Sequence, residues 1–271
     1  MILRKSTKEL DRETAGWLGQ PATTPLRGVT RDADRFEIAE QLVSFTAPGS
    51  FAGDQYRTIR HAVDRLRRDA GLRLLAVSSA VPGDGKSVTA LNLAATLAQA
   101  RRDRVLIVDA DLRRPSVGLY LGLDPVASPG LSGALLDPTC GLAEATVHLD
   151  RFNLSVIPAG IPPIEPYELL NSPRLEALLS EARRLYDCVV VDTSPLLPFP
   201  DSRLITRWMD GCLIVVAAHR TPRKLVREAL ATVDAKKLIG IVFNGDDRSR
   251  STNYGYYGYY VPGAPRDSRG W

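Results

Sequence analysis

Six short, continuous runs of Val, Ile and Leu alternate along this chain with stretches of helical periodicity, and this alternation limits the possible folds most. The runs cover residues 72–79, 104–110, 152–159, 187–193, 211–218 and 238–244. Continuous apolar runs are typical of strands buried on both faces of a parallel sheet. The intervening helical stretches cover residues 86–101, 131–137, 173–186, 201–208 and 222–236. The sequence therefore predicts an α/β fold, a doubly wound and mainly parallel sheet with helices on both faces.

The chain divides into three parts by composition. Residues 1–50 mix Thr, Gly, Pro and paired charges, which predicts a loosely ordered extension with one short helix at 35–45. Residues 51–245 carry the periodic pattern, which starts with an amphipathic helix at 54–70, and are expected to form one domain. Residues 246–271 hold a glycine-spaced tyrosine cluster with almost no aliphatic residues, so we expect a flexible tail.

Composition excludes several classes of protein. The net charge of +4 comes from 35 basic and 31 acidic residues that are scattered along the chain, so no nucleic-acid partner is expected. The three cysteines do not suffice for a disulfide framework, and two of them, Cys188 and Cys212, lie in apolar runs. No run approaches 18 apolar residues, and the N-terminus has no apolar signal core. We therefore expect a cytoplasmic chain with reduced thiols.

A phosphate-binding loop is predicted where the first strand meets the following helix. Residues 80–87 read AVPGDGKS and match GxxxxGK[ST] except at Ala80. Gly83 and Gly85 would let backbone N–H groups surround a phosphate, and the helix N-terminus would add partial positive charge. Lys86, expected at a solvent-facing helix start, would reach the outer phosphates. The alternative is a surface turn, which the strand–loop–helix context disfavours.

Acidic side chains close two of the predicted strands. Asp109 and Asp111 follow the run at 104–110, and Asp192 closes the run at 187–193. Each acid alone could be a helix N-cap. Because parallel strands end at the same edge of a sheet, however, all three should emerge beside the phosphate loop, where open α/β sheets bind ligands. Together they predict a site for Mg²⁺ and a nucleotide.

These motifs resemble those of the bacterial tyrosine kinases of capsule and exopolysaccharide loci, which are P-loop proteins. SSAVPGDGKS (78–87), VLIVDADLRRP (105–115) and VVVDTSP (189–195) are similar to the family's three Walker motifs. DQYRTIR (54–60) resembles its ExxRxxR oligomerisation helix, with Asp54 in place of Glu. GIPPIEPYELL (160–170) is similar to a family stretch that usually reads GxxPPNPxELL. The resemblance covers roughly residues 50–260 and implies a P-loop NTPase fold.

The resemblance implies ATP and Mg²⁺ as cofactors and distributes the roles among the site residues. Lys86, Asp109 and Asp111 are the catalytic candidates, and Asp109 is the one expected to accept or orient the tyrosine proton. An exchange of roles between Asp109 and Asp111 stays open. Mg²⁺ would be organised by Ser87, Asp111 and Asp192. The nucleotide would be bound by the phosphate loop and, at the adenine, by Asn244; the set is Pro82, Gly83, Asp84, Gly85, Lys86, Ser87, Val88 and Asn244.

The resemblance also implies that the tail is the autophosphorylation substrate. Its five clustered tyrosines are Tyr254, Tyr256, Tyr257, Tyr259 and Tyr260. Asp54, Arg57 and Arg60 would join copies into a ring-like homo-oligomer in which one chain phosphorylates its neighbour; a merely solvated helix face is the alternative. The implied partners are a separate membrane-spanning polysaccharide co-polymerase or adaptor as activator, and a tyrosine phosphatase. The chain would then lie at the inner face of the cell membrane.

The main competing family is the partition and division-site ATPases, which share the sheet and the Walker motifs. Those proteins carry a signature lysine five residues before the lysine of the phosphate loop, and here Val81 stands at that position. A tyrosine-rich tail also has no purpose in them. The alternative function is thus an ATP-driven switch that phosphorylates no protein, and an assay for phosphotyrosine separates the two.

Overall fold

The computed structural model describes residues 29–31, 37–100, 102–124 and 128–246 of the chain. The strands are β1 (Val29–Arg31), β2 (Leu74–Ser79), β3 (Val105–Asp109), β4 (Val147–Leu149), β5 (Leu154–Ile157), β6 (Cys188–Asp192), β7 (Gly211–Ala217) and β8 (Leu238–Asn244). The helices are α1 (Val43–Thr46), α2 (Phe51–Ala70), α3 (Lys86–Ala98), α4 (Val117–Tyr120), α5 (Gly130–Leu136), α6 (Leu142–Ala145), η2 (Asp150–Phe152), α7 (Pro166–Leu170), α8 (Pro173–Leu185), α9 (Asp201–Thr206) and α10 (Arg223–Leu230).

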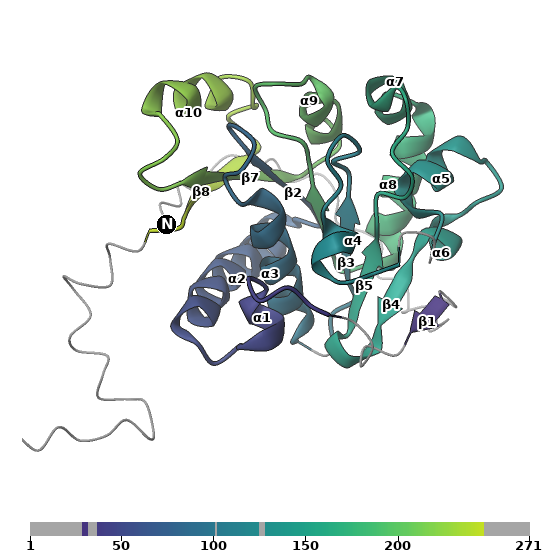
Figure 1. Cartoon of the computed structure of the whole chain (residues 1–271), viewed down its shortest axis with the longest axis horizontal. Coiled ribbons are helices and arrows are strands. Elements are labelled where there is room, and N and C mark those ends of the chain that lie inside the picture. Colours follow the sequence, from purple (N-terminus) through teal and green to yellow (C-terminus); the bar gives the residue numbers. More distant parts are fainter. Residues whose placement is uncertain (1–28, 32–36, 101, 125–127, 247–271) are drawn as a thin grey trace, which may run out of the picture.

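The strands of this part of the chain form a single sheet in the order β1-β4-β5-β3-β6-β2-β7-β8. All neighbouring strands run parallel except β4 and β5, which pair antiparallel. Helices cover both faces of the sheet (Figure 1). The predicted fold class is therefore confirmed, and each of the six predicted runs contains a strand.

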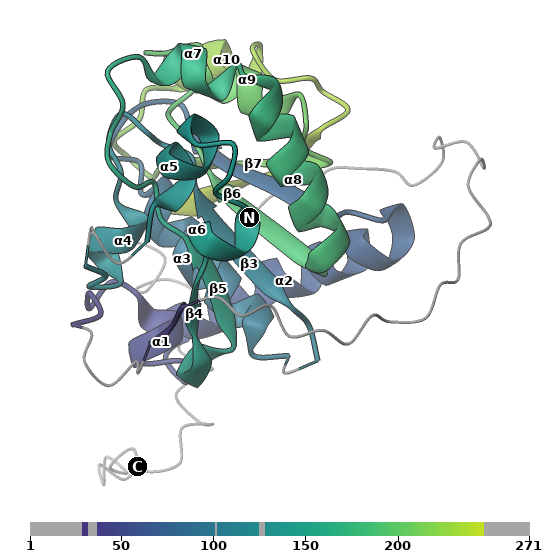
Figure 2. The same ribbon diagram turned by 90° about the vertical axis from the view of Figure 1, so that its right-hand side faces the viewer.

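Successive residues of the central strands pack on opposite faces of the sheet, which gives the molecule two cores. On β2, Leu75 and Val77 contact the core under α2 and α3. Leu74 and Ala76 face the other core, to which α8 and α9 contribute. Figure 2 shows α2 and α8 on opposite sides of the strands. Burial on both faces explains why these runs contain no alternating polar residues.

The described part of residues 1–50 corrects the predicted domain boundary. Where a helix at 35–45 was predicted, residues 37–46 of the described structure contain only the short helix α1. Leu42 and Phe45 are buried in the core with α3, and the Ser44 N–H donates to the Asn92 side chain at 2.8 Å. Residues 42–50 thus belong to the packed domain. Composition alone missed this because two buried side chains leave no periodic pattern.

Several other elements differ from the predicted ones: β1, β4, α4, α6 and α7 were not predicted, and α10 is shorter than expected. The strand β4 was not predicted, because a three-residue strand that turns back through η2 carries too short a pattern. The helix predicted at 222–236 ends at Leu230. Beyond it, the Asp234 carboxylate accepts the Lys236 N–H at 2.8 Å, a local turn that competes with helix. Among the helices of the described ranges, none is long and apolar enough to cross a membrane.

Candidate active site

The phosphate loop joins β2 to α3 at the carboxyl edge of the sheet. Gly83 and Gly85 adopt φ angles of 86° and 91°, a left-handed conformation that suits glycine. A Cβ on Gly85 would lie only 2.0 Å from the Asn244 amide nitrogen. That nitrogen donates to the carbonyl oxygen of Asp84 at 3.0 Å. The end of β8 therefore holds the loop in shape, and Asn244 contacts the loop itself.

Lys86, the first residue of α3, lies between two of the predicted metal-site carboxylates. Its Nζ is 2.8 Å from Asp111 and 3.5 Å from Asp192, and it also donates to the Ser87 hydroxyl at 3.1 Å. Its side chain is not solvent-facing as predicted, since only 9% of the residue is exposed. The correction has a simple cause: an ammonium at this edge gains two carboxylate partners by folding inward.

Charge coupling at the site shifts the pKa values of its groups. Burial alone would lower the pKa of Lys86, but attraction to Asp192 and Asp111 raises it above its ordinary value, so the ammonium stays protonated. Burial raises the pKa of Asp192, and Lys86 only partly offsets this effect. Burial and repulsion from Asp192 raise the pKa of Asp109 to about 7. The site thus concentrates negative charge that one ammonium cannot fully balance.

Asp109 lies at the predicted edge, but its carboxylate does not face the cavity. One oxygen accepts the backbone N–H groups of Ser116 and Val117 at 3.0 and 2.9 Å. The other accepts the N–H of Asp111 at 3.2 Å. Asp109 is fully buried and shapes the loop that carries Asp111. Its expected place beside the tyrosine hydroxyl is therefore not supported, and of the two acids Asp111 is the one that lines the cavity.

Asp192 and Ser87 fit a bound metal ion. The Oδ2 atom of Asp192 is buried and has no hydrogen-bond partner, and the Ser87 hydroxyl lies within hydrogen-bond reach of this carboxylate. No cluster of three or more His, Cys, Asp or Glu side chains in the described ranges forms a ready metal centre. Mg²⁺, however, is ordinarily held by one or two carboxylates together with substrate phosphates and water. Asp111 and Asp192 would supply two such carboxylates.

A cavity of about 310 Å³ opens in front of the phosphate loop. Of the predicted residues it contains those of the loop and one acid, namely Pro82, Gly83, Gly85, Lys86, Ser87 and Asp111. Five predicted site residues are not among its lining: Asp84, Val88, Asp109, Asp192 and Asn244. Asp84 and Asn244 support the loop, while Val88 packs against the core below it. These residues thus support the loop from behind the cavity and do not line it.

The far wall of the cavity includes residues that the sequence did not single out. The Arg113 guanidinium lies 4.3 Å from the centre of the Phe199 ring. It also forms two hydrogen bonds to the fully buried carboxylate of Asp201. The strong hydrogen bond to Asp201 raises the pKa of Arg113. Tyr120 completes this aromatic side. The pairing of residues 113 and 201 is long-range, so no local motif could have indicated it.

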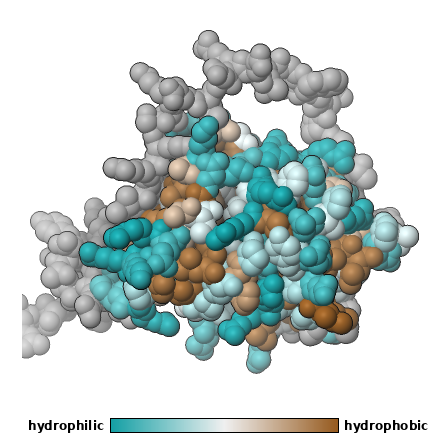
Figure 3. Space-filling view, turned by 90° about the horizontal axis from the view of Figure 1, so that it is seen from above, coloured by the Kyte–Doolittle hydropathy of each residue, from teal (hydrophilic) through white to brown (hydrophobic). Residues whose placement is uncertain are grey.

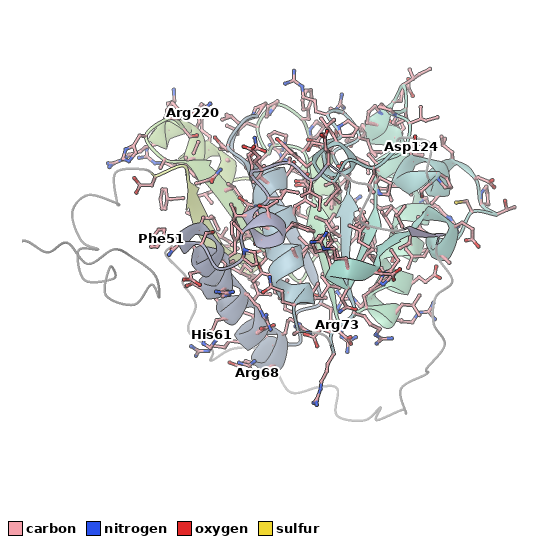
Figure 4. All side chains as sticks on the ribbon, turned by 60° about the horizontal axis from the view of Figure 1, so that its bottom comes forward. Phe51, His61, Arg68, Arg73, Asp124 and Arg220 are labelled. Atoms are coloured by element: carbon pink, nitrogen blue, oxygen red, sulfur yellow. The ribbon has the colours of Figure 1, made fainter. Side chains whose placement is uncertain are left out.

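The predicted oligomerisation residues lie on α2, at the side of the sheet away from α8. Asp54 and Arg57 form an exposed ion pair with each other. Arg60 is partly used inside the fold, because it donates to the Thr96 carbonyl of α3 at 2.9 Å and contacts Asp64 at 3.2 Å. Figure 4 shows the labelled side chains of His61 and Arg68 pointing outward from the same helix. The five tail tyrosines lie outside the described residues.

The strand–loop–helix with carboxylates at the same edge defines a P-loop nucleotide-binding domain, and a family model described as an AAA domain matches residues 72–234. The tyrosine-protein kinase YwqD of Bacillus subtilis (strain 168) is 36% identical over 224 residues, which cover 82% of this chain and 92% of the relative. The solved kinase domain of the Escherichia coli tyrosine kinase ETK is 28% identical with a TM-score of 0.72, covering 79% of this chain and 83% of that one. The chain belongs to the bacterial tyrosine-protein kinases.

A further relative is a larger protein. The succinoglycan biosynthesis transport protein ExoP of Rhizobium meliloti (strain 1021) is 34% identical over 213 residues, which cover 77% of this chain and 27% of ExoP. The chain thus spans about a quarter of that relative. These relatives favour a kinase of exopolysaccharide systems over the ATP-driven switch without protein phosphorylation.

Proposed function

We propose that this kinase uses ATP and Mg²⁺ to phosphorylate the tyrosine cluster in the tail of a neighbouring copy, and so regulates synthesis or export of a capsular or extracellular polysaccharide. One observation carries the proposal. Lys86, Asp111 and Asp192 meet at the end of the phosphate loop, beside a cavity with room in front of it. Among the described residues that line the cavity there is no Cys or His to form a covalent intermediate, which fits direct phosphoryl transfer.

The phosphate loop and Lys86 would bind the phosphates of ATP. Ser87 and Asp192 would hold Mg²⁺ directly and Asp111 through water, so that the Asp111 carboxylate stays free to take a proton; the ion would neutralise charge on the phosphate oxygens. For Lys86 to reach those phosphates, its contacts with Asp111 and Asp192 must be exchanged for contacts with the nucleotide. Asn244 would support the loop through its hydrogen bond to Asp84. We also propose that Asn244, at the end of β8, contacts the adenine.

Asp111 is our proposed partner of the acceptor tyrosine. The phenol oxygen attacks the γ-phosphorus, the bond between that phosphorus and the bridging oxygen breaks, and ADP leaves. The phenol proton passes to the Asp111 carboxylate. This exchange of roles with Asp109 rests on the cavity in front of the phosphate loop, whose lining includes Asp111 and not Asp109. Tyr120 and Phe199, the two aromatic residues of the cavity lining, would contact the phenol ring of the acceptor tyrosine.

A mixing experiment tests transfer between subunits. An active chain that lacks residues 247–271 is incubated with ATP, Mg²⁺ and a full-length Lys86→Met chain, and phosphotyrosine is followed by immunoblot and mass spectrometry. We expect phosphate on Tyr254–Tyr260 of the Lys86→Met chain. Phosphate release without phosphotyrosine would favour the ATPase switch. Phosphotyrosine on the wild-type chain but none in the mixture would restrict transfer to one chain.

Oligomerisation through α2 is the second part of the proposal. Asp54 and Arg57 are exposed and could exchange their mutual ion pair for pairs with a neighbour, whereas Arg60 is already engaged with α3. We expect Arg57→Glu to reduce the particle size seen by multi-angle light scattering, with Arg65→Glu as a control on an exposed arginine of the same helix. Phosphorylated wild-type protein should also be smaller than a variant with all five tail tyrosines changed to Phe, since each phosphate adds about −1.5 to −2 charges. Equal sizes for Arg57→Glu and wild type would remove α2 from the interface.

A membrane-spanning activator is the third part. ExoP, of which this chain matches about a quarter, is named as a transport protein of polysaccharide biosynthesis. We propose that a separate co-polymerase or adaptor of such a system brings the chain to the inner face of the membrane, and that a tyrosine phosphatase reverses the modification. Stimulation of phosphotyrosine formation by the adaptor's cytoplasmic segment tests this.

A further inference from the structure

A hollow larger than the cavity at the phosphate loop lies elsewhere on the described structure. It is an apolar groove of about 1120 Å³ between α5, α7 and the connecting residues 161–165. Three of the six exposed large hydrophobic side chains of the described residues line it: Leu136, Ile161 and Ile164, at 66%, 75% and 98% exposure. Seen from above, hydrophobic surface appears on the right of Figure 3, the side on which Figure 1 has α5 and α7. Such a concentration of exposed apolar surface marks an interaction site.

The floor of the groove is preformed. Gly130 and Gly160 have φ angles of 64° and 77°, and a Cβ on either would lie within 2.4 Å of the facing backbone. The Leu131 N–H donates to the Pro158 carbonyl at 2.8 Å, and the Ser132 N–H donates to the Ala159 carbonyl at 2.9 Å. These contacts fix the start of α5 against the chain that leaves β5. A ligand would therefore meet a rigid surface and need not order it.

The groove combines proline and isoleucine surfaces with acidic groups. Its charged lining residues are Glu165 and Glu168. Serine hydroxyls supply the other polar groups. A matching ligand would be aromatic, with hydroxyl groups that donate to carboxylates, and flanked by positive charge.

The tail of this chain has that composition. Residues 254–260 are tyrosine and glycine only, and residues 247–271 contain four arginines against two aspartates. We propose that the groove docks the unphosphorylated tyrosine cluster of a neighbouring copy while one of its tyrosines occupies the cavity at the phosphate loop. This inference rests on the proposed transfer between subunits and deepens it.

The sheet sets the spacing between the two sites. The groove follows β5 and the phosphate loop follows β2, and three strand spacings separate them, about 14 Å in all. An extended peptide covers at most about 3.3–3.6 Å per residue, so at least four residues are needed to bridge that distance. Tyr256 and Tyr260 are four residues apart, and Tyr254 lies five residues before Tyr259. A docked tyrosine thus presents another one to the phosphate loop.

Phosphorylation would release the docked cluster. Each phosphate brings about −1.5 to −2 charges toward Glu165 and Glu168 and is costly to bury against isoleucine and proline. The groove would therefore prefer tails that still carry free tyrosines.

Steady-state kinetics test the proposal. The active chain carries Ile164→Asp, and the acceptor is a full-length Lys86→Met chain at increasing concentration. We expect KM for the acceptor to rise at least tenfold and kcat to stay the same. Leu119→Asp, which changes another exposed leucine (79%) outside the groove, is the matched control and should keep wild-type kinetics. Ile164→Leu should restore KM, and an unchanged rate on a short unrelated tyrosine peptide would show that the fold is intact.

A reciprocal arrangement identifies the occupant. With Ile164→Asp on the Lys86→Met acceptor and a wild-type active chain, KM should not change, because only the phosphorylating copy needs its groove. If KM rises whether Ile164→Asp is on the active chain or on the acceptor, and light scattering shows smaller particles, the body of another copy covers the groove instead of the tail. A fully phosphorylated acceptor should inhibit at least tenfold more weakly than an unphosphorylated one. Wild-type KM in the Ile164→Asp chain would overturn the docking inference and leave the proposed function intact, whereas absence of phosphotyrosine with the wild-type chain would overturn the function.

Discussion

Replacing Lys86 by methionine is expected to reduce phosphoryl transfer to tyrosine by about 10²–10³-fold or more, because a positive charge at the transferred phosphate is lost. The burial of Lys86 adds an effect that a solvent-facing lysine would not have. Without the ammonium, Asp111 and Asp192 lose their shared cation. Removal of one partner of a buried pair costs about 3–5 kcal/mol, so the nucleotide-free variant should also unfold at lower temperature.

Lys86→Arg is the control that separates the two effects. It keeps the charge near the carboxylates but cannot place a compact ammonium at the phosphates. We expect most of the stability to return while the transfer rate stays low. Activity comes from the phosphotyrosine assay, and stability from thermal unfolding at low protein concentration without nucleotide. Wild-type activity in Lys86→Met would remove the nucleotide site from our account, and an unchanged unfolding temperature would contradict the ion-pair role.

The second large effect is expected at Asp111. Asp111→Asn should lower kcat for tyrosine phosphorylation by about 10²–10⁴-fold, the usual contribution of a proton acceptor. It should also lower stability, because Asp111 is the nearer carboxylate partner of Lys86 and accepts the Arg114 N–H at 3.1 Å, although Lys86 keeps Asp192 as a partner. Asp109→Asn should lower stability without a comparable loss of kcat. An amide nitrogen would face one of the three backbone N–H groups that Asp109 accepts, which costs about 1–3 kcal/mol.

The comparison of these two variants decides between the roles. Rates of phosphotyrosine formation and urea unfolding are measured on both proteins under the same conditions. Loss of transfer in Asp109→Asn with unaltered unfolding, together with retained transfer in Asp111→Asn, would return the proton-accepting role to Asp109.

The mainly parallel sheet could be predicted because physics leaves few alternatives. Strands buried on both faces have to be continuously apolar, and right-handed crossovers place their acidic ends at one edge. The same reasoning brought Asp111 and Asp192 to the phosphate loop. It failed for β4, whose three residues carry no pattern, and for Leu42 and Phe45, which are buried by contacts with distant residues of α3 and η2.

The directions in which the site side chains point could not be predicted from the sequence. The motif around residues 109–111 contains two aspartates, and only the hydrogen bonds of the following loop determine which of them faces the cavity. The burial of Lys86 depends on carboxylates from two other strands. Arg113 and Asp201 meet across 88 residues of sequence. The groove at residues 161–165 was also hidden, since its segment has no periodicity and becomes a surface only against α5.

The strand β8 ends at the phosphate loop, where Asn244 contacts Asp84, and the tail begins two residues later. The tyrosines Tyr254–Tyr260 are therefore tethered to the reacting edge of the sheet, at Asn244, by ten to sixteen residues, which reach at most about 58 Å. One substrate confined to such a volume has an effective concentration on the order of millimolar. Once copies assemble, the kinase can therefore work with a weak intrinsic affinity for the acceptor tyrosine. Dilution of the protein should slow the assembly step more than phosphoryl transfer within an assembled particle.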